Sequence, residues 1–365
     1  MDEGTVIVGT HIDQAVALPL DLPKPIIHSC TTKLCDVYDP GGVISQIEIL
    51  LSDDGRAYKV EDRILKETIF GSVHCGFCLS ALEVGEGYAY DHNSLVAVKK
   101  YSKETIKNKG ITTQENPLKE FAAMQFLGND NPHLMGQLDC LEDNSYYYSI
   151  MTFCTGGELF SYIDTGAGRM SEPKARKTFA QILEGLSAMH AQGIAHRDMS
   201  LENILIFHPD DDDKMRIVII DWGMCVRVPQ YKGESGRVPF LVPSLGCCGK
   251  RNYIAPEVIR NANKATGVPF CPMRADIWAM GVILFILLTG IPPFETAIDT
   301  NRAYDAVKKG KLRALVQHWG HGGLSSLVLD LLERLFTIAP QDRLTIEEIR
   351  EHPWMIAPDP LPLLS

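Results

Sequence analysis

The sequence lacks three features that direct proteins to membranes or nucleic acids. It has no excess of positive charge, because its formal net charge is -11, whereas nucleic acids and anionic membranes bind basic faces. Its longest apolar stretch, Ile277 to Thr289, is shorter than the roughly 18 residues of a membrane-spanning helix and predicts a buried core helix. It opens with no signal segment, has Asp2 where a myristoylated protein has Gly, and closes with no prenylation box. We therefore expect an intracellular monomer, cytoplasmic or nuclear, that binds neither membranes nor nucleic acids.

The ten cysteines occur without a secretory signal, which favours reduced thiols. The segment Cys75-Gly76-Phe77-Cys78 has the spacing of a redox dithiol, but a redox pair opens a helix and the flanking residues here look extended. An alternative is a four-thiolate zinc site that adds Cys30 and Cys35, although the spacing is loose.

The chain is long enough for two lobes and a short extension, since it has 365 residues of which 45% are hydrophobic. Residues 1 to about 56 carry none of the catalytic signals described below. Within them, the turn residues Ser52-Asp53-Asp54-Gly55 separate two apolar runs, Ile47 to Leu51 and Ala57 to Val60. This pattern predicts a β-hairpin that leads into the first lobe.

A short segment from His196 to Asn203 (His-Arg-Asp-Met-Ser-Leu-Glu-Asn) contains groups suited to phosphoryl transfer. Asp198 provides a base for a hydroxyl nucleophile, and Asn203, five residues later, provides a neutral ligand for a metal ion. Asp221, in Asp-Trp-Gly, supplies a second carboxylate for the cation. Phosphoryl transfer depends on positioning and charge neutralisation, and these three side chains predict that chemistry.

Two further motifs occur in a fixed order around this segment. Val96-Ala97-Val98-Lys99 precedes it, and Ala255-Pro256-Glu257 follows it. With them the chain resembles the eukaryotic protein kinases of the serine/threonine type, and its late motifs are most similar to the calcium/calmodulin-dependent kinase group. The resemblance implies ATP and Mg²⁺ as cofactors and serine or threonine residues of protein substrates as acceptors.

The resemblance also implies an α+β, bilobal fold. We expect a small antiparallel sheet with one regulatory helix in the N-lobe and a larger, mostly helical C-lobe. The corresponding domains are an extension over residues 1–57, the N-lobe and hinge over 58–154, and the C-lobe with a short tail over 155–365.

Particular residues match the catalytic positions of the family. By resemblance, Asp198 orients the acceptor hydroxyl and takes its proton, and Asn203 and Asp221 hold the metal. Lys99 contacts the inner phosphates and pairs with Glu120, for which Glu115 is the second choice. Glu120 lies on a helix predicted from Asn116-Pro117, a cap residue followed by proline, to near Gly128.

The nucleotide-binding residues follow from the same resemblance. The segment around Leu65 aligns with the glycine-rich loop of the family, with Gly71 as its third glycine and Val73 as the valine that follows. In this alignment Lys66 and Thr68 replace the first two glycines. A shifted alignment on Gly71, Val73 and Gly76 is possible but fits less of the family pattern. The remaining predicted contacts are Val73 and Ala97 above the adenine, Leu205 below it, Met151 at the back pocket, the Thr152 carbonyl and Cys154 amide at its edge, and Glu158. Glu158 is expected to bind ribose or a basic substrate residue, or else to be an exposed cap of the next helix.

The chain departs from the family at two positions that we interpret together. Serine/threonine kinases usually carry Lys two residues after the catalytic Asp and Thr five residues before the Ala of Ala-Pro-Glu, but this chain has Ser200 and Lys250 there. We hypothesise an exchange in which Lys250 reaches Asp198 and the transferred phosphate while Ser200 supplies the hydroxyl. The alternative is a catalytically impaired pseudokinase that acts as a scaffold. Glu158 and Glu202 near the cleft favour basic residues before the acceptor.

Other expectations concern structural support and regulation. Asp276 is expected to hold the catalytic-loop backbone, Arg343 to pair with Glu257, and Trp222 to pack on Met124 and His196. We call residues Asp221 to Glu257 the activation segment. Its hydroxyl candidates for phosphorylation before Lys250 are Tyr231, Ser235 and Ser244, and Gly246 occupies the position that is usually phosphorylated in the family.

Overall fold

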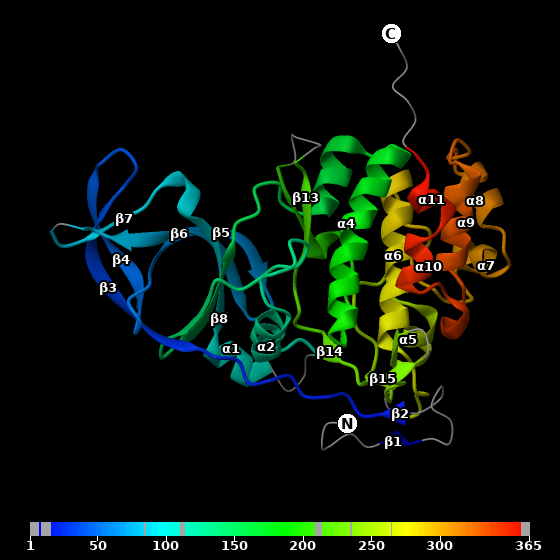
Figure 1. The fold of residues 1–365 in the computed structure, drawn as a ribbon, viewed down its shortest axis with the longest axis horizontal. Coiled ribbons are helices and arrows are strands. Elements are labelled where there is room, and N and C mark those ends of the chain that lie inside the picture. The colour runs from blue at the N-terminus through cyan, green and yellow to red at the C-terminus, as the bar shows by residue number, and fades with distance from the viewer. Residues whose placement is uncertain are drawn as a thin grey trace, which may run out of the picture. The chain divides into compact units, whose positions relative to one another are not determined.

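The computed structural model describes residues 7–8, 16–83, 85–109, 114–208, 214–233, 236–263 and 265–358. The chain divides into two compact units. We call Leu22–Asp130 with Met135–Thr155 the sheet unit, and Met1–Asp21, Asn131–Leu134 and Gly156–Ser365 the helical unit. Figure 1 labels the elements of both units.

An eight-stranded sheet, two α-helices and a 3-10 turn (His92–Ser94) make up the described part of the sheet unit. The elements are β3 (His28–Tyr38), β4 (Ile44–Ser52), β5 (Ala57–Thr68), β6 (Gly71–Ala81), β7 (Tyr88–Ala89), β8 (Leu95–Ser102), α1 (Lys103–Lys109), α2 (Pro117–Leu127), β9 (Asp139–Glu142) and β10 (Tyr146–Thr152). The predicted α+β class is confirmed. The sheet is not purely antiparallel, however, because β3 runs parallel to β7 and β9.

The strand pairings close this sheet on itself. Strand β3 pairs with β4, and β5, β6, β8, β10 and β9 follow in turn until β9 pairs with β3. Figure 1 shows β3 to β6, in blue and cyan, curving round toward β8. A closed sheet leaves fewer strand edges exposed for pairing with other chains.

Strands β3 and β4 lie within the segment interpreted from sequence as an extension. The hairpin predicted there is present, because Leu51 pairs with Ala57 across a turn in which Gly55 has a φ of 90°. Strand β3 was not predicted. Its Cys30 and Val37 are buried, and Cys30 joins Leu50 in a hydrophobic cluster. The extension therefore contributes core residues to the sheet unit.

Alternation along β8 places its side chains on two faces of the sheet. Val96 and Val98 are buried in the cluster that contains Cys30 and Leu50. Lys99 points to the other face, where it is 8% exposed. The strand therefore supplies apolar packing on one face and a buried cation on the other.

Helix α2 begins and ends as predicted. The side chain of Asn116 accepts hydrogen bonds from the amides of Leu118 and Lys119, and Pro117 occupies the first turn. Gly128 ends the helix with a φ of 73° and donates its amide to the Met124 carbonyl. Local capping thus fixes both ends of the helix that carries Glu120.

The helical unit contains helices, short sheets and two-residue strands. Its strands are β1 (Ile7–Val8), β2 (Val16–Ala17), β11 (Ile194–Ala195), β12 (Ile204–Phe207), β13 (Arg216–Ile219), β14 (Val226–Arg227), β15 (Gln230–Gly233) and β16 (Gly236–Pro239). Its helices are α3 (Leu159–Ser161), α4 (Glu172–Ala191), α5 (Pro256–Arg260), α6 (Pro272–Thr289), α7 (Arg302–Lys308), α8 (Leu312–His318), α9 (Ser326–Leu335), α10 (Ile346–Arg350) and α11 (Pro353–Ile356). A π-helical turn (Tyr162–Ala167) follows α3, and 3-10 turns occur at Leu201–Asn203 and Pro340–Asp342.

Helix α6 is the central buried helix of this unit. By length and composition it could cross a membrane, but 89% of it is buried inside the structure, as in a core helix. It starts at Pro272, five residues before the apolar run, and stops before Gly290, whose φ is 79°. Figure 1 shows α6, in yellow, beside α4, in green.

Candidate active site

The loop that carries Asp198 is held by a buried carboxylate on α6. The amides of His196 and Arg197 donate to the two oxygens of Asp276 at 2.8 Å each, and His190 Nε2 lies 3.0 Å from Asp276 Oδ2. Asp276 is 1% exposed, so these bonds are shielded from water. The predicted role of Asp276 is confirmed, and the loop is tied to the core helix of the unit.

Asp198, Asn203 and Lys250 form one hydrogen-bonded cluster. Asp198 Oδ2 accepts from Asn203 Nδ2 at 2.8 Å and from Lys250 Nζ at 3.0 Å, while Asp198 Oδ1 accepts from the Lys250 amide at 2.9 Å. Lys250 Nζ also donates to Asn203 Oδ1 at 3.1 Å. The structure thus places the Lys250 cation beside Asp198, where the exchange hypothesis requires it.

Gly249 permits the close approach of Lys250 to Asp198, a role that was not predicted from the sequence. Its φ is 97°, and a Cβ atom there would lie 2.8 Å from the Arg197 carbonyl oxygen and 3.4 Å from Asp198 Oδ1. A side chain at this position would therefore separate the two loops. The sequence signal was a glycine directly before the unusual lysine.

Ser200 does not join the cluster. Its side chain is buried, and in the described part of the chain its Oγ has no hydrogen-bond partner. Its backbone carbonyl instead accepts from the Asn203 amide at 3.1 Å. The structure therefore gives no support to the part of the exchange hypothesis in which Ser200 supplies the hydroxyl.

Asn203 and Asp221 lie at the same end of a two-stranded sheet. Ile204 pairs with Ile219, and the Ile220 amide donates to the Asn203 carbonyl at 2.9 Å. Asp221 is the next residue and has a φ of 72°. The Asn203 amide nitrogen donates to Asp198 Oδ2, and its oxygen, which accepts from Lys250 Nζ at 3.1 Å, is the kind of ligand that Mg²⁺ prefers.

Trp222, which follows Asp221, is fully buried. Its ring centroid lies 5.1 Å from that of His196, as predicted. Its indole Nε1 has no hydrogen-bond partner among the described residues. The core therefore accommodates the large Trp222 side chain, but the described residues offer no hydrogen-bond acceptor to its indole N–H.

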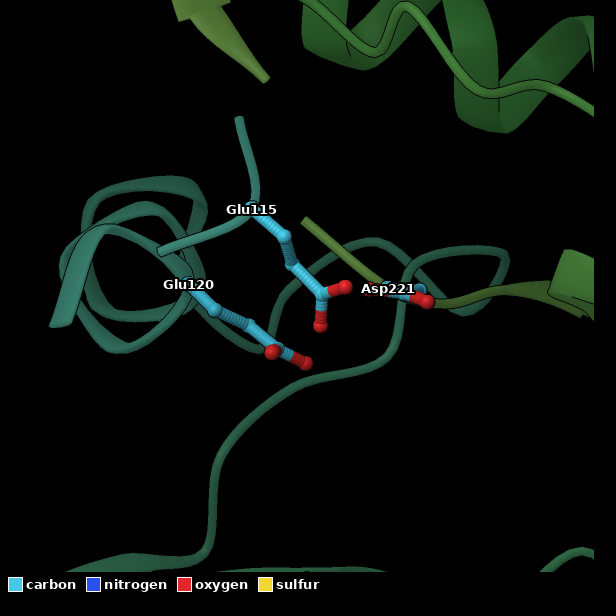
Figure 2. Close-up of side chains that lie close together, drawn as sticks. All are labelled: Glu115, Glu120 and Asp221. Atoms are coloured by element: carbon cyan, nitrogen blue, oxygen red, sulfur yellow. The ribbon is translucent and has the colours of Figure 1, made fainter. Parts of the chain in front are cut away.

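In the sheet unit, Lys99 forms a bidentate ion pair with Glu120. Lys99 Nζ lies 2.9 Å from Glu120 Oε1 and 3.0 Å from Oε2, and both residues are buried. Figure 2 shows Glu115 and Glu120 at the start of α2, with their carboxylate groups directed the same way. A carboxylate oxygen of Glu115 lies within 4.8 Å of one of Glu120. Glu120, the first-choice partner predicted from the sequence, forms the ion pair with Lys99.

The β5–β6 hairpin occupies the position of the predicted glycine-rich loop. Lys66 pairs with Val73, and Thr68 pairs with Gly71, so the turn falls at Ile69 and Phe70. Gly71 packs against β8, because a Cβ there would lie 1.9 Å from the Lys100 carbonyl oxygen. Its glycine is therefore required by the sheet itself. Leu65, on β5, is 41% exposed.

The other predicted nucleotide contacts fall in both units. In the sheet unit, Ala97 pairs with Met151 and both are half-buried, Val73 pairs with Lys99, Thr152 is exposed, and Cys154 is buried. In the helical unit, Glu158 and half-buried Leu205 form an isolated backbone bridge. Glu158 is the N-cap residue of α3, but its side chain makes no capping hydrogen bond and is half-buried rather than exposed.

The activation segment contacts the N-terminal part of the helical unit. The Ala17 amide donates to the Leu241 carbonyl, and the Leu20 amide donates to the Arg227 carbonyl, both at 2.9 Å. Of the hydroxyl candidates, Tyr231 packs on Phe240, Ser244 donates to the Asn261 carbonyl at 2.8 Å, and Ser235 lies outside the described residues. The guanidinium of Arg197 donates a hydrogen bond to the Met224 carbonyl oxygen at 3.2 Å.

The cysteine alternatives are not supported. Cys30, Cys35, Cys75 and Cys78, the cysteines of both alternatives, form no disulfide, and Cys75 and Cys78 lie on strand β6 with no helix directly after it. In the described ranges, no cysteine belongs to a cluster of potential metal ligands. Burial raises the pKa of both thiols, which disfavours the reactive thiolate.

Sequence analysis also missed Tyr101. Its hydroxyl donates to Glu120 Oε2 at 2.7 Å, and the residue is fully buried. The available signal was alternation, since residues two apart on a strand share a face and Tyr101 is two residues after Lys99.

Comparisons with known proteins agree with this geometry. The protein kinase domain model matches residues 81–355. The chain is 35% identical to SNF1-related protein kinase catalytic subunit alpha KIN12 of Arabidopsis thaliana over 274 residues, which is 75% of this chain and 47% of the relative. It is 30% identical to calcium/calmodulin-dependent protein kinase type 1 of Macrobrachium nipponense over 303 residues, which is 83% of this chain and 78% of the relative.

Some relatives are considerably longer. Maternal embryonic leucine zipper kinase of Danio rerio is 35% identical over 239 residues, which cover 65% of this chain but 31% of that protein. The chain thus spans half or less of the length of two of these three relatives. The family match nevertheless covers most of the chain and includes its catalytic motifs. The chain therefore belongs to the protein kinase domain family.

Proposed function

We propose that this chain is a serine/threonine protein kinase that transfers the γ-phosphoryl group of ATP to protein substrates. The observation that carries the proposal is the Asp198–Asn203–Lys250 cluster, which joins a base, an oxygen ligand for a metal and a cation. The resemblance of the chain to serine/threonine kinases supports the same activity.

Asp198 acts on the acceptor hydroxyl. Its carboxylate is fixed by Asn203 and Lys250, so it can accept a hydrogen bond from the hydroxyl and then its proton without reorienting. The hydroxyl oxygen bonds to the γ-phosphorus as the bond to the β–γ bridging oxygen breaks, and ADP leaves with the electron pair. Holding the groups in place before the reaction lowers the entropic part of the barrier.

Lys250 supplies positive charge beside the base. The Lys250 side chain is 35% exposed, so it is accessible to a further ligand besides Asp198 and Asn203. The cation would stabilise charge on the equatorial oxygens of the transferred group, the role that the lysine two residues after the catalytic aspartate has by family resemblance.

Two further sets of residues complete the proposed site. Lys99, oriented by Glu120, binds the inner phosphates. Asn203 and Asp221 hold Mg²⁺, and their oxygen donors suit this hard cation. When bound, Mg²⁺ neutralises charge on the β- and γ-phosphate oxygens.

The residues that we propose to bind nucleotide are those that family resemblance gave: Leu65, Gly71, Val73, Ala97, Met151, Thr152, Cys154, Glu158 and Leu205. We also propose substrates with basic residues before the acceptor, because Glu158 and Glu202 supply negative charge. Glu202 accepts a hydrogen bond from the Tyr253 hydroxyl at 3.2 Å, which holds its carboxylate. An intracellular location is proposed because the cysteines of the described residues form no disulfide.

The test is transfer from γ-labelled ATP to a degenerate serine/threonine peptide library. We expect labelled phosphoserine or phosphothreonine with the wild-type chain and a rate lower by about 10²–10⁴-fold with Asp198→Asn, the range for loss of a general base. Enrichment of basic residues before the acceptor would support the proposed preference. ATP binding without transfer would favour the pseudokinase alternative.

A further inference from the structure

The Tyr101 hydroxyl is a further hydrogen-bond donor to the Glu120 carboxylate, besides Lys99. Lys99 Nζ donates to both oxygens, and the Tyr101 hydroxyl donates to Oε2 at 2.7 Å. Lys99 and Tyr101 both project from β8, where Lys99 Nζ lies 5.2 Å from the centroid of the Tyr101 ring, whereas Glu120 projects from α2. The hydroxyl therefore adds a bond between the helix and the strand to those that the lysine makes.

The Tyr101 ring is itself fixed by apolar packing. It meets the Phe121 ring edge-on, with centroids 5.2 Å apart, and Phe121 is the residue after Glu120 on α2. Phe70, at the tip of the β5–β6 hairpin, is 1% exposed and belongs to the same cluster. The hydroxyl is thus held against Glu120 by side chains from the helix and from the hairpin.

The protonation state of Tyr101 suits a permanent donor. Burial, with the neighbouring Glu120 charge, raises the pKa of its phenol well above the usual value. The phenol therefore remains protonated at neutral pH. A protonated phenol donates to a carboxylate in a charge-assisted hydrogen bond, which is stronger than one between neutral groups.

We propose that Tyr101 is a positioning residue that locks α2 to β8 and so keeps the Glu120 carboxylate in place to orient Lys99 toward the ATP phosphates. The catalytic part of this inference rests on the proposed kinase function; the lock itself does not. It predicts that the Lys99–Glu120 pair persists in the nucleotide-free chain. It also gives a role to a residue that the kinase motifs did not single out.

The sheet unit contains a matched control. Tyr58 is also buried, and its hydroxyl donates at 2.9 Å to the buried carboxylate of Asp139, which in turn pairs with Arg56 at 2.9 Å. Tyr58→Phe therefore removes the same group from the same kind of contact. It does so without touching Lys99, Glu120 or α2.

The first test measures amide hydrogen exchange of α2 in the nucleotide-free chain. Removing a hydrogen bond to a charged group should speed exchange of α2 about tenfold in Tyr101→Phe and leave it unchanged in Tyr58→Phe. In a Glu120→Gln background, Tyr101→Phe should have a smaller effect, because the charged acceptor is gone. Equal exchange of α2 in the two tyrosine variants would overturn the lock.

The second test separates positioning from loss of folded protein. Tyr101→Phe should raise the KM for ATP several-fold and leave the KM for peptide unchanged, whereas a smaller folded fraction lowers only the apparent kcat. An unchanged KM for ATP would overturn the catalytic part. If the wild-type chain transfers no phosphate, the kinase proposal fails, and the exchange measurement still decides whether Tyr101 holds α2.

Discussion

Lys250 and Asp198 are 52 residues apart in the sequence, yet Lys250 Nζ lies 3.0 Å from Asp198 Oδ2. The backbone of the same lysine donates to Asp198 Oδ1 at 2.9 Å, so two bonds fix the activation segment against the catalytic loop. The cation enters from a different segment than in the family pattern. Its charge nevertheless lies beside the base.

Lys250→Ala should lower phosphoryl transfer by about 10²–10³-fold, as loss of one preorganised charge-stabilising donor does. The affinity for ATP should change little, because Lys99 and Glu120 are intact. Steady-state transfer and equilibrium ATP binding measure the two effects. Turnover near that of the wild type would refute a catalytic role for Lys250.

Adding Ser200→Lys to Lys250→Ala should not restore the lost rate, because the Ser200 side chain is fully buried and its hydroxyl makes no hydrogen bond to the described part of the catalytic cluster. The same assay applies, with Ser200→Met in the Lys250→Ala background as the uncharged control of comparable length, and we expect equal rates in the two double variants. A faster rate with lysine than with methionine would show that a cation at this position can replace Lys250.

Asp276→Ala should destabilise the helical unit by about 3–5 kcal/mol, the cost of breaking a buried charged contact. The change leaves the amides of His196 and Arg197 without their acceptor. Urea titration gives the shift in midpoint. Asp305→Asn is the control, because its ion pair with Lys309 is exposed and should contribute under about 1 kcal/mol. Similar shifts in both variants would contradict the anchoring role.

Parts of this fold were accessible from sequence because their determinants are local. Asn116 and Pro117 mark the start of α2 and Gly128 marks its end, and these signals can be recognised without the rest of the chain. The pairing of Arg343 with Glu257 at 2.9 Å also followed from short family motifs. Motif spacing likewise identified Asp198, Asn203, Lys99 and Glu120 as candidates.

Other parts depend on tertiary contacts that no local pattern encodes. Strand β3 has polar and exposed residues along most of its length, and its partners include distant β9. Such strands are stabilised by packing against their neighbours more than by their own propensity. The burial of Ser200 and the contact of Tyr101 with Glu120 likewise required the folded chain.

Leu50→Ala should destabilise the sheet unit by about 2–5 kcal/mol, the usual cost of such a truncation in a core. Leu50 is 6% exposed and packs in the cluster of Cys30, Tyr58 and Val98. Leu34→Ala is the matched control, since Leu34 lies on the adjoining strand β3 but is 59% exposed. Urea midpoints compare them. Equal, small shifts would mean that residues 28–52 do not contribute to the core.

Cys30 should resist alkylation by iodoacetamide at pH 8.5 in the folded chain. Burial, with nearby Asp143, raises the pKa of its thiol from 9.0 to about 12, so the thiolate fraction at this pH falls, and reactivity should increase only as the pH rises toward 12. Peptide mapping after a timed reaction measures the modification. The same reaction in urea is the control, because the unfolded thiol regains its usual pKa. Rapid labelling in the folded chain would contradict the burial of Cys30.

Single-turnover transfer from γ-labelled ATP to a serine or threonine peptide tests the proposed kinase activity most directly. With enzyme in excess over ATP and Mg²⁺ present, the wild-type chain is expected to form phosphopeptide in one fast phase, and Asp198→Asn is expected to bind ATP equally well while transferring far more slowly. Equal rates for the two chains, or bound ATP that the wild-type chain never transfers, would contradict catalysis by Asp198.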